Sequence, residues 1–149
     1  MNLPADDRAR HLAYVRDFFE RIPFNRLLGI EVRELSAERV VFCVPFREEL
    51  IGDGQRRALH GGVLSASADA CGGAAVWAAI GPEDRVSTID LRVDYLRPAR
   101  PEDIMVEGVV LRVGNRVGVA SIRVFHASSP AETVADCKGV YSVKRAEER

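Results

Sequence analysis

The chain is poor in cysteine, and the cysteines it has point away from disulfides and metal sites. Its 149 residues include only three, Cys43, Cys71 and Cys137, an odd number that cannot all pair. None of them stands at the spacing of a metal-ligand motif. We therefore expect three reduced thiols that pack as small buried side chains, without a bound metal.

Net charge and long apolar runs are lacking as well. The formal net charge is -1, so no overall field draws the protein toward nucleic acid or an anionic membrane. Charged residues interrupt every apolar stretch near the N-terminus, so we expect no secretory h-region among these residues. The longest apolar run, residues 74–80, is far shorter than the roughly 20 residues that span a bilayer. We expect a soluble, cytoplasmic protein with no nucleic-acid or membrane partner.

The length fits one domain over residues 1–149, because a single core typically spans about 100–200 residues. Its first part is a predicted helix over about residues 5–22, in which Val15 and Phe19 belong to an apolar stripe at helical spacing. Pro23 is expected to end this helix.

A core over about residues 24–144 follows, and it is dominated by strands. Glycine and polar residues indicate a loop at 47–59, and Gly114-Asn115 is a hairpin signal. Alternation of apolar and polar residues predicts strands at residues 29–35, 39–46, 88–95, 103–113, 116–126 and 133–143.

One segment differs from the rest in texture. Between His60 and Glu83 the chain is rich in Ala, Gly and Ser and carries a single formal charge, Asp69. A helix that is small or apolar all round is normally buried. Two strands, a long helix and four strands without further helices predict an antiparallel sheet with one helix across it, which is an α+β fold.

At this point the sequence resembles a known family. Leu59-His60-Gly61-Gly62-Val63-Leu64, followed by Asp69 on the buried helix, is similar to the HGG-type hotdog thioesterases of the phenylacetate-pathway class. The likeness continues through residues 90–99 (DLRVDYLRPA) and covers roughly residues 24–144. It implies a hotdog fold, hydrolysis of the thioester of an acyl-CoA without any cofactor, and a homodimer or dimer-of-dimers tetramer.

The resemblance also implies roles for individual residues. The catalytic carboxylate of the family corresponds to Asp69, its oxyanion-binding amide to Gly61, and a water-positioning hydroxyl to Thr88. Many relatives carry an asparagine in the loop before HGG, and here Asp53 or Gln55 occupies that place. An ionised aspartate cannot donate a hydrogen bond as asparagine does.

The chemistry of these residue types suits thioester hydrolysis. The first turn of a helix has free N–H groups, and Gly61 and Gly62 let a substrate carbonyl approach them closely. Asp69 would activate a water or attack directly. Gly61 and Asp69 are eight residues apart, about 12 Å along a helix, so they cannot both touch one thioester. A second, antiparallel copy of the helix would bring them together, which makes a dimer a condition of catalysis.

Several assignments stay open. His60 is either catalytic or a structural residue that holds the loop, and Thr88 faces either the site or solvent. For the CoA phosphates we expect Arg97, Arg100 and Arg116 near the Asn115 turn, with Arg56 and Arg57 as the next candidates. Gly62 and Gln55 complete the expected substrate-binding set. Trp77 is expected in the core rather than in an acyl pocket.

Two other functions compete. A dehydratase or hydratase of the same fold would pair a histidine with a carboxylate, and His60 and Asp69 are available for that. A non-catalytic acyl-CoA-binding or regulatory module has no need for a carboxylate in the middle of its buried helix.

Overall fold

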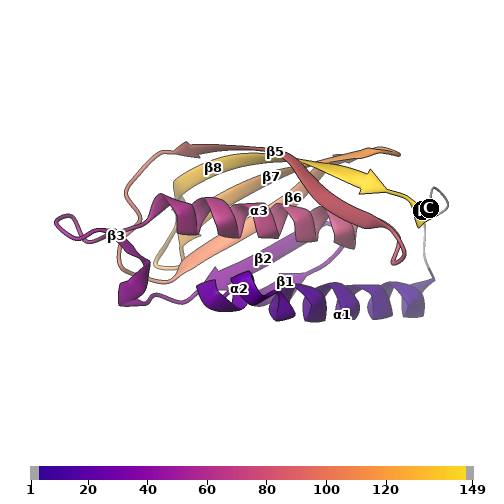
Figure 1. Cartoon of the computed structure of the whole chain (residues 1–149), viewed down its shortest axis with the longest axis horizontal. Helices are drawn as coiled ribbons and strands as arrows, with labels where there is room; N and C mark the ends of the chain where they lie inside the picture. The colour runs from indigo at the N-terminus through magenta and orange to yellow at the C-terminus, as the bar shows by residue number, and fades with distance from the viewer. Residues whose placement is uncertain (1–3, 147–149) are drawn as a thin grey trace.

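The computed structural model describes residues 4–146, which form a curved sheet, one long central helix and a helical N-terminal segment (Figure 1). The elements in chain order are α1 (Ala5–Arg21), α2 (Pro23–Leu28), β1 (Glu31–Leu35), β2 (Arg39–Val44), the 3-10 helix η1 (Glu48–Leu50), β3 (Ile51–Asp53), β4 (Ala58–Leu59), α3 (Gly61–Ala78), β5 (Arg85–Tyr95), β6 (Ile104–Val113), β7 (Val117–His126) and β8 (Ser129–Lys144). Within these residues, no helix combines the length and the hydropathy needed to cross a membrane.

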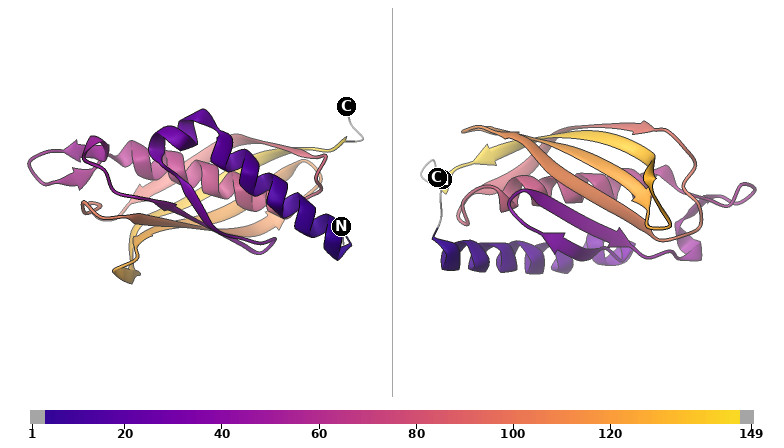
Figure 2. Two further views of the ribbon diagram at one scale, coloured as in Figure 1. Left: turned by 90° about the horizontal axis from the view of Figure 1, so that it is seen from below. Right: turned by 180° about the vertical axis from the view of Figure 1, so that it is seen from behind.

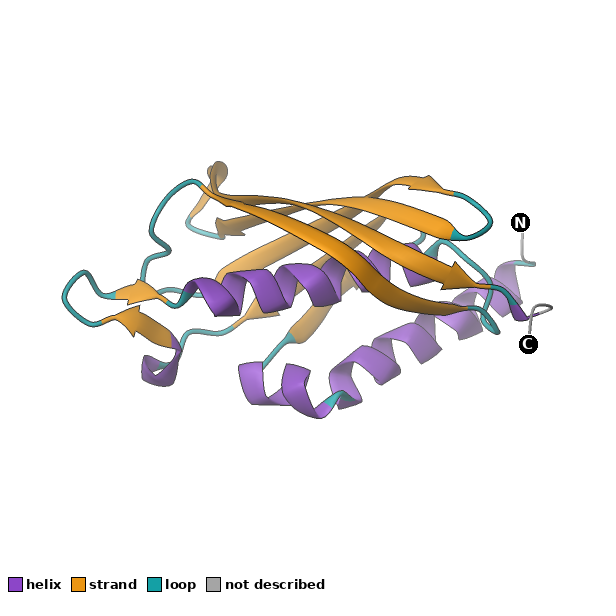
Figure 3. Ribbon diagram, turned by 45° about the horizontal axis from the view of Figure 1, so that its top comes forward, coloured by secondary structure: helices purple, strands orange, loops and turns teal. Residues whose placement is uncertain are grey.

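Six strands form the main sheet in the order β1-β2-β6-β7-β8-β5, and every neighbouring pair is antiparallel. The sheet curves around α3, which lies along its concave face (Figures 1 and 3). The predicted fold class, an antiparallel sheet wrapped around one long helix with an N-terminal helix added, is confirmed. β5 lies at one edge of the sheet, next to β8 alone.

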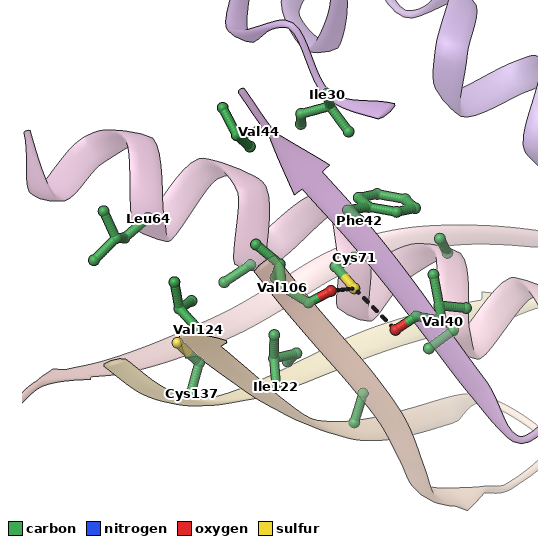
Figure 4. Packing of buried hydrophobic residues seen from close by; sticks show 14 of the residues in the cluster. Ile30, Val40, Phe42, Val44, Leu64, Cys71, Val106, Ile122, Val124 and Cys137 are labelled. Carbon is green, nitrogen blue, oxygen red and sulfur yellow. Dashed lines mark hydrogen bonds between the residues drawn. The ribbon is translucent and has the colours of Figure 1, made fainter. Parts of the chain in front are cut away.

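The composition of α3 explains its central position. Alanine, glycine and serine leave the backbone of the helix free to approach the strands, and Ala68, Cys71 and Ala74 are fully buried against them. The Cys71 thiol donates to the carbonyl oxygens of Val106 at 3.4 Å and Val40 at 3.7 Å, two groups from neighbouring strands (Figure 4). Burial raises the pKa of this thiol. All three cysteines are free and buried, as predicted.

Tyr141 of β8 makes a close contact between the sheet and α3. Its hydroxyl donates to the backbone carbonyl of Asp69 at 3.0 Å, and its ring is buried. The hydroxyl stands where a Cβ on Gly72 would be, so Gly72 has to be a glycine for this contact to exist. At Gly73, the next residue, a side chain would fit, because an added Cβ would lie 3.5 Å from Tyr141 Cε1, which is an ordinary van der Waals distance.

The N-terminal helix lies alongside α3 and over the start of the sheet (Figure 2). The predicted stripe is confirmed at Val15 and Phe19, which are buried. His11 joins them unexpectedly: it is 2% exposed, and its Nε2 donates to the Trp77 carbonyl at 2.8 Å. This hydrogen bond fastens α1 to the C-terminal end of α3.

Several predicted boundaries were wrong. Pro23 does follow the end of α1, but it also opens α2, because proline is well suited to the first position of a helix. Gly29, with φ of 74°, ends α2, so β1 begins at Glu31 rather than at Gly29. Residues 47–59 are not wholly irregular, since they contain η1 and the small hairpin of β3 and β4. β2 ends at Val44, β5 already begins at Arg85, and β8 at Ser129.

The close approach of Tyr141 predicts opposite outcomes for two neighbouring substitutions. Gly72→Ala should lower the free energy of unfolding by about 1–3 kcal/mol, because the added methyl overpacks the core against the Tyr141 hydroxyl. Gly73→Ala has room for its methyl and should leave stability unchanged or raise it by up to about 1 kcal/mol through helix propensity. Urea unfolding of both variants measures the difference, and equal stabilities would contradict this account.

Candidate active site

The first turn of α3 is capped by its own histidine. His60 is the N-cap residue, and its Nδ1 accepts from the Gly62 N–H at 2.8 Å. Within the described chain no acceptor bonds the Gly61 N–H, as expected for the first turn of a helix. The Gly61 carbonyl accepts from the Tyr95 hydroxyl at 3.2 Å. This geometry gives His60 a structural contact and leaves Gly61 with a donor for a ligand.

Asp53, which precedes the HGG motif, forms hydrogen bonds within its own turn. Asp53 Oδ1 accepts from the backbone N–H groups of Gln55 at 3.0 Å and Arg56 at 3.1 Å, which closes the turn between β3 and β4. Gln55 is exposed in this turn. The hairpin projects beyond the N-terminal end of α3 (Figure 3). Neither Asp53 nor Gln55 lines the groove that contains Asp69.

Asp69 and Thr88 are brought together by α3 and β5. Asp69 is half-buried on α3, and its Oδ1 accepts from the Thr88 hydroxyl at 2.9 Å. Tyr141 holds the backbone of the same residue from below. Asp69 is therefore held at its carboxylate by Thr88 and at its backbone by Tyr141, and the other carboxylate oxygen, Oδ2, accepts no hydrogen bond within residues 4–146.

A β-bulge explains how Thr88 reaches Asp69. Strict alternation over β5 predicted Thr88 on the same face as Asp90. The pairing of β5 with β8 shifts between these two residues, so Ile89 has no partner. Thr88 pairs with Tyr141 and Leu91 with Gly139, which puts Thr88 and Leu91 on one face, toward α3. Bulges of this kind redirect a side chain at many active sites. Of the two alternatives left open for Thr88, the face toward α3 is the one observed; simple alternation favours the other face because it takes no account of an inserted residue.

A groove of about 700 Å³ runs over the exposed face of α3 and contains this pair. Its volume falls in the range of small-molecule sites, which is about 300–1,000 Å³. The walls come from α1 and α2 on one side of the helix and from the start of β5 on the other. The groove is lined by Tyr14, Phe18, Phe19, Ile22, Phe24, Asn25, Ala66, Asp69, Ala70, Gly73, Trp77, Tyr141 and residues 82–88. The sequence did not indicate that aromatic residues of α1 line a groove beside Asp69. Trp77, expected in the core, packs there and also lines the groove.

Of the three predicted phosphate-binding arginines, Arg97 and Arg100 lie close together, because both approach Glu132 Oε1. Arg97 donates to the Thr133 carbonyl at 2.7 Å and lies 3.8 Å from Glu132. Arg100 pairs with Glu102 at 2.7 Å, and hydrogen bonds from Arg100 and then Ser128 lower the pKa of Glu102 to about 2. Both guanidinium groups are thus engaged by acidic or carbonyl oxygens. Arg57 is likewise held by Glu48.

Arg116 has different surroundings. It lines a hollow of about 550 Å³ with Arg85 and Lys144, and within residues 4–146 none of the three forms an ion pair. Arg85 stands directly opposite Lys144 in the pairing of β5 with β8. Two like charges in directly opposite positions destabilise the pairing of two strands. The hollow and the Asp69 groove share Arg85, Val86 and Ser87 as lining residues. Asn115 lies in the adjacent turn, where its carbonyl accepts from Arg145.

The register of β5 and β8 brings this basic group together, because Arg85 and Lys144 are 59 positions apart in the chain, and no local sequence pattern indicates it. Elsewhere in the described residues, no set of three or more histidine, cysteine or acidic side chains is arranged to hold a metal ion.

A six-stranded antiparallel sheet wrapped around a helix that carries a carboxylate defines a hotdog-fold protein. Comparisons with known proteins give the family: residues 57–131 match the model of the thioesterase superfamily. The chain belongs to this superfamily.

Individual relatives agree with this assignment. A candidate esterase of Halobacterium salinarum is 37% identical over 87% of this chain and 83% of its own length. The medium/long-chain acyl-CoA thioesterase YigI of Escherichia coli is 33% identical over 70% of this chain and 76% of its own length. A thioesterase-related structure from Shewanella oneidensis superposes with a TM-score of 0.81 at 30% identity, and the alignment covers 91% of this chain and 96% of the other.

Proposed function

We propose that this protein is an acyl-CoA thioesterase of the HGG type and that Asp69 is its catalytic carboxylate. The observation that carries the proposal is the placement of Asp69: it is half-buried on the floor of a groove, and Thr88 orients it at 2.9 Å. A relative at 33% identity is named as an acyl-CoA thioesterase. The three buried free thiols are in keeping with the predicted cytoplasmic location.

The proposed reaction is hydrolysis by an activated water. Asp69 takes a proton from the water while the water oxygen forms a bond to the carbonyl carbon of the thioester. The carbonyl oxygen becomes negative and is stabilised by a backbone N–H at the start of a helix. The C–S bond then breaks, and the sulfur leaves with the proton held by Asp69, giving a free acid and CoA. Direct attack by the carboxylate is the variant of this scheme that the sequence left open.

The oxyanion donor has to come from a second subunit. Gly61 and Asp69 are both on α3, about 12 Å apart along its axis. The exposed edge of β5 offers a way to join two chains, because it lacks a neighbour on one side and presents Ile89, which is 59% exposed. We therefore keep the predicted dimer, in which Gly61 of the partner subunit faces Asp69. A dimer of such dimers remains compatible with it.

For the CoA phosphates we propose the hollow of Arg85, Arg116 and Lys144. Three cations without ion-pair partners among the described residues would gain from a bound polyanion, which would also relieve the repulsion between Arg85 and Lys144. The hollow adjoins the Asp69 groove through Val86 and Ser87, so one extended ligand can reach both.

The competing enzyme function is disfavoured by the position of His60. A hydratase needs its histidine to act as acid or base at the substrate, but the Nδ1 of His60 already accepts from the Gly62 N–H at 2.8 Å and caps α3. A binding module is separated from a thioesterase by measuring release of free thiol from acyl-CoA.

The first prediction from the proposed function concerns Asp69. Asp69→Asn keeps the size of the side chain and an acceptor for Thr88, but it removes the base. We expect kcat/KM for acyl-CoA to fall by at least about 100-fold, the lower bound for general-base catalysis. Asp136→Asn, at an exposed position of β8, serves as the matched control and should be unaffected. A loss of less than threefold in Asp69→Asn would remove this residue from the mechanism.

The second prediction tests the shared site. Asp69→Ala subunits are mixed with Gly61→Pro subunits, in which the donor N–H is missing while proline remains suited to the first helical position. Each parent should be inactive, and exchange should restore one complete site per heterodimer. If both parents fold and exchange but the mixture stays inactive, then the site is not built from two chains.

The third prediction compares two arginines. Arg116→Glu should raise KM for acyl-CoA with a smaller change in kcat, because a grip on the phosphates acts equally in ground and transition states. Arg100→Glu should have the lesser effect, since Arg100 already pairs with Glu102. The effect of Arg116→Glu should shrink as salt is raised, because the Debye length falls from about 8 Å at physiological ionic strength to about 3 Å at 1 M, so that exposed charges attract each other less. A larger effect from Arg100→Glu would return the phosphates to the predicted Arg97–Arg100 region.

A further inference from the structure

The floor of the Asp69 groove is one face of α3. Ala66, Asp69, Gly73 and Trp77 follow each other at intervals of three or four residues, which places them on one side of the helix, and Ala70 adjoins Asp69 on the same side. The other residues of this face near Asp69, which are Ala66, Ala70 and Gly73, have small or no side chains, so they leave space above the helix backbone. At Gly73 the nearest atoms to an added Cβ are ring carbons of Tyr141 at 3.5 Å and Phe19 at 3.9 Å. Trp77 is the first large side chain along this face.

Aromatic rings surround Trp77 at that end of the groove. The centroid of its ring lies 4.8 Å from that of Phe18 and 5.8 Å from that of Tyr14, and both pairs are T-shaped. Phe19 adds a third contact at 6.2 Å. Phe18 is still 41% exposed although it packs on Trp77, so apolar surface remains open toward the groove. A polar ligand gains nothing from such a wall, whereas a hydrocarbon does.

We infer that the acyl chain of the substrate lies along α3 from Asp69 toward Trp77, and that Trp77 and Phe18 limit its length. This inference rests on the proposed thioesterase function and assigns its substrate class. Asp69 and Trp77 are eight residues apart, which is about 12 Å along the helix axis. A saturated chain advances about 1.25 Å per carbon atom, so this length holds roughly 8–10 carbons. The enzyme is thus a medium-chain acyl-CoA thioesterase.

The first arm of the test measures kcat/KM on straight-chain acyl-CoAs from butyryl to palmitoyl. The wild type should be most active near 8–10 carbons, since each methylene that finds apolar surface contributes roughly fourfold. Phe18→Ala and Trp77→Ala should each raise the ratio of palmitoyl to octanoyl activity at least tenfold. Gly73→Val narrows the floor and should lower the ratio of octanoyl to butyryl activity at least tenfold. Leu27→Ala is the matched control, because Leu27 is 66% exposed on α2 and does not line the groove.

The second arm does not depend on turnover. Trp77 is the single tryptophan of the chain, so its fluorescence reports on this end of the groove. In the Asp69→Asn protein, octanoyl- and decanoyl-CoA should shift the emission, while CoA alone and acetyl-CoA should not. The same shift without any hydrolysis by the wild type would refute the proposed function but support the acyl groove.

The opposite outcomes overturn the inference itself. If the wild type hydrolyses acyl-CoA but Phe18→Ala and Gly73→Val leave the chain-length profile unchanged, then the acyl chain lies elsewhere. Both variants keep the test valid if Trp77→Ala fails to fold. If instead Phe18→Ala changes the oligomeric state in light scattering and leaves the profile unchanged, then this aromatic wall is an interface between copies of the chain.

Discussion

The structure depends on how closely α3 approaches the sheet. At Gly72 the helix comes so near to β8 that the Tyr141 hydroxyl takes the place of a side chain, and at Cys71 a thiol bonds the carbonyls of two strands. This packing can only be achieved by a helix of small residues. Such a helix has few side chains to solvate a charge, so the carboxylate of Asp69 is supported from the sheet by the Thr88 hydroxyl, while the Tyr141 hydroxyl holds the backbone carbonyl of the same residue.

The support from the sheet depends in turn on an irregularity. Without the bulge at Ile89, Thr88 would point away from α3 and Asp69 would lose its only side-chain donor among the described residues. A bulge costs part of the hydrogen-bond ladder. Here it lies in the middle of an edge strand, where one side of the ladder has no neighbour within the chain. The position that interrupts regular pairing is thus also the one that completes the surroundings of Asp69.

Patterns that act over short distances in the chain were predictable. Helical spacing located α1, the small-residue texture located α3, and alternation located the six strands of the main sheet, because each pattern reflects burial of one face. Features that depend on register were not predictable. Three features depend on which residues the whole fold brings together. They are the bulge at Ile89, the pairing of Arg85 with Lys144, and the hydrogen bond from His11 to the Trp77 carbonyl. Of the candidate site, Asp69 and Thr88 meet, whereas Asp53, Gln55, Arg97 and Arg100 are engaged in contacts of their own.

The attachment of α1 has a consequence for how such a protein diverges. This helix contributes side chains to one wall of the groove, yet it provides none of the strands and lies outside the segment that matches the superfamily, residues 57–131. It is fastened to α3 by aromatic contacts and by the single imidazole of His11. Substitutions in α1 can therefore reshape the groove while the hydrogen-bonded framework around Asp69 stays intact. A lineage with this architecture can exchange one ligand for another by altering its N-terminal helix, without passing through an intermediate that has lost its chemistry.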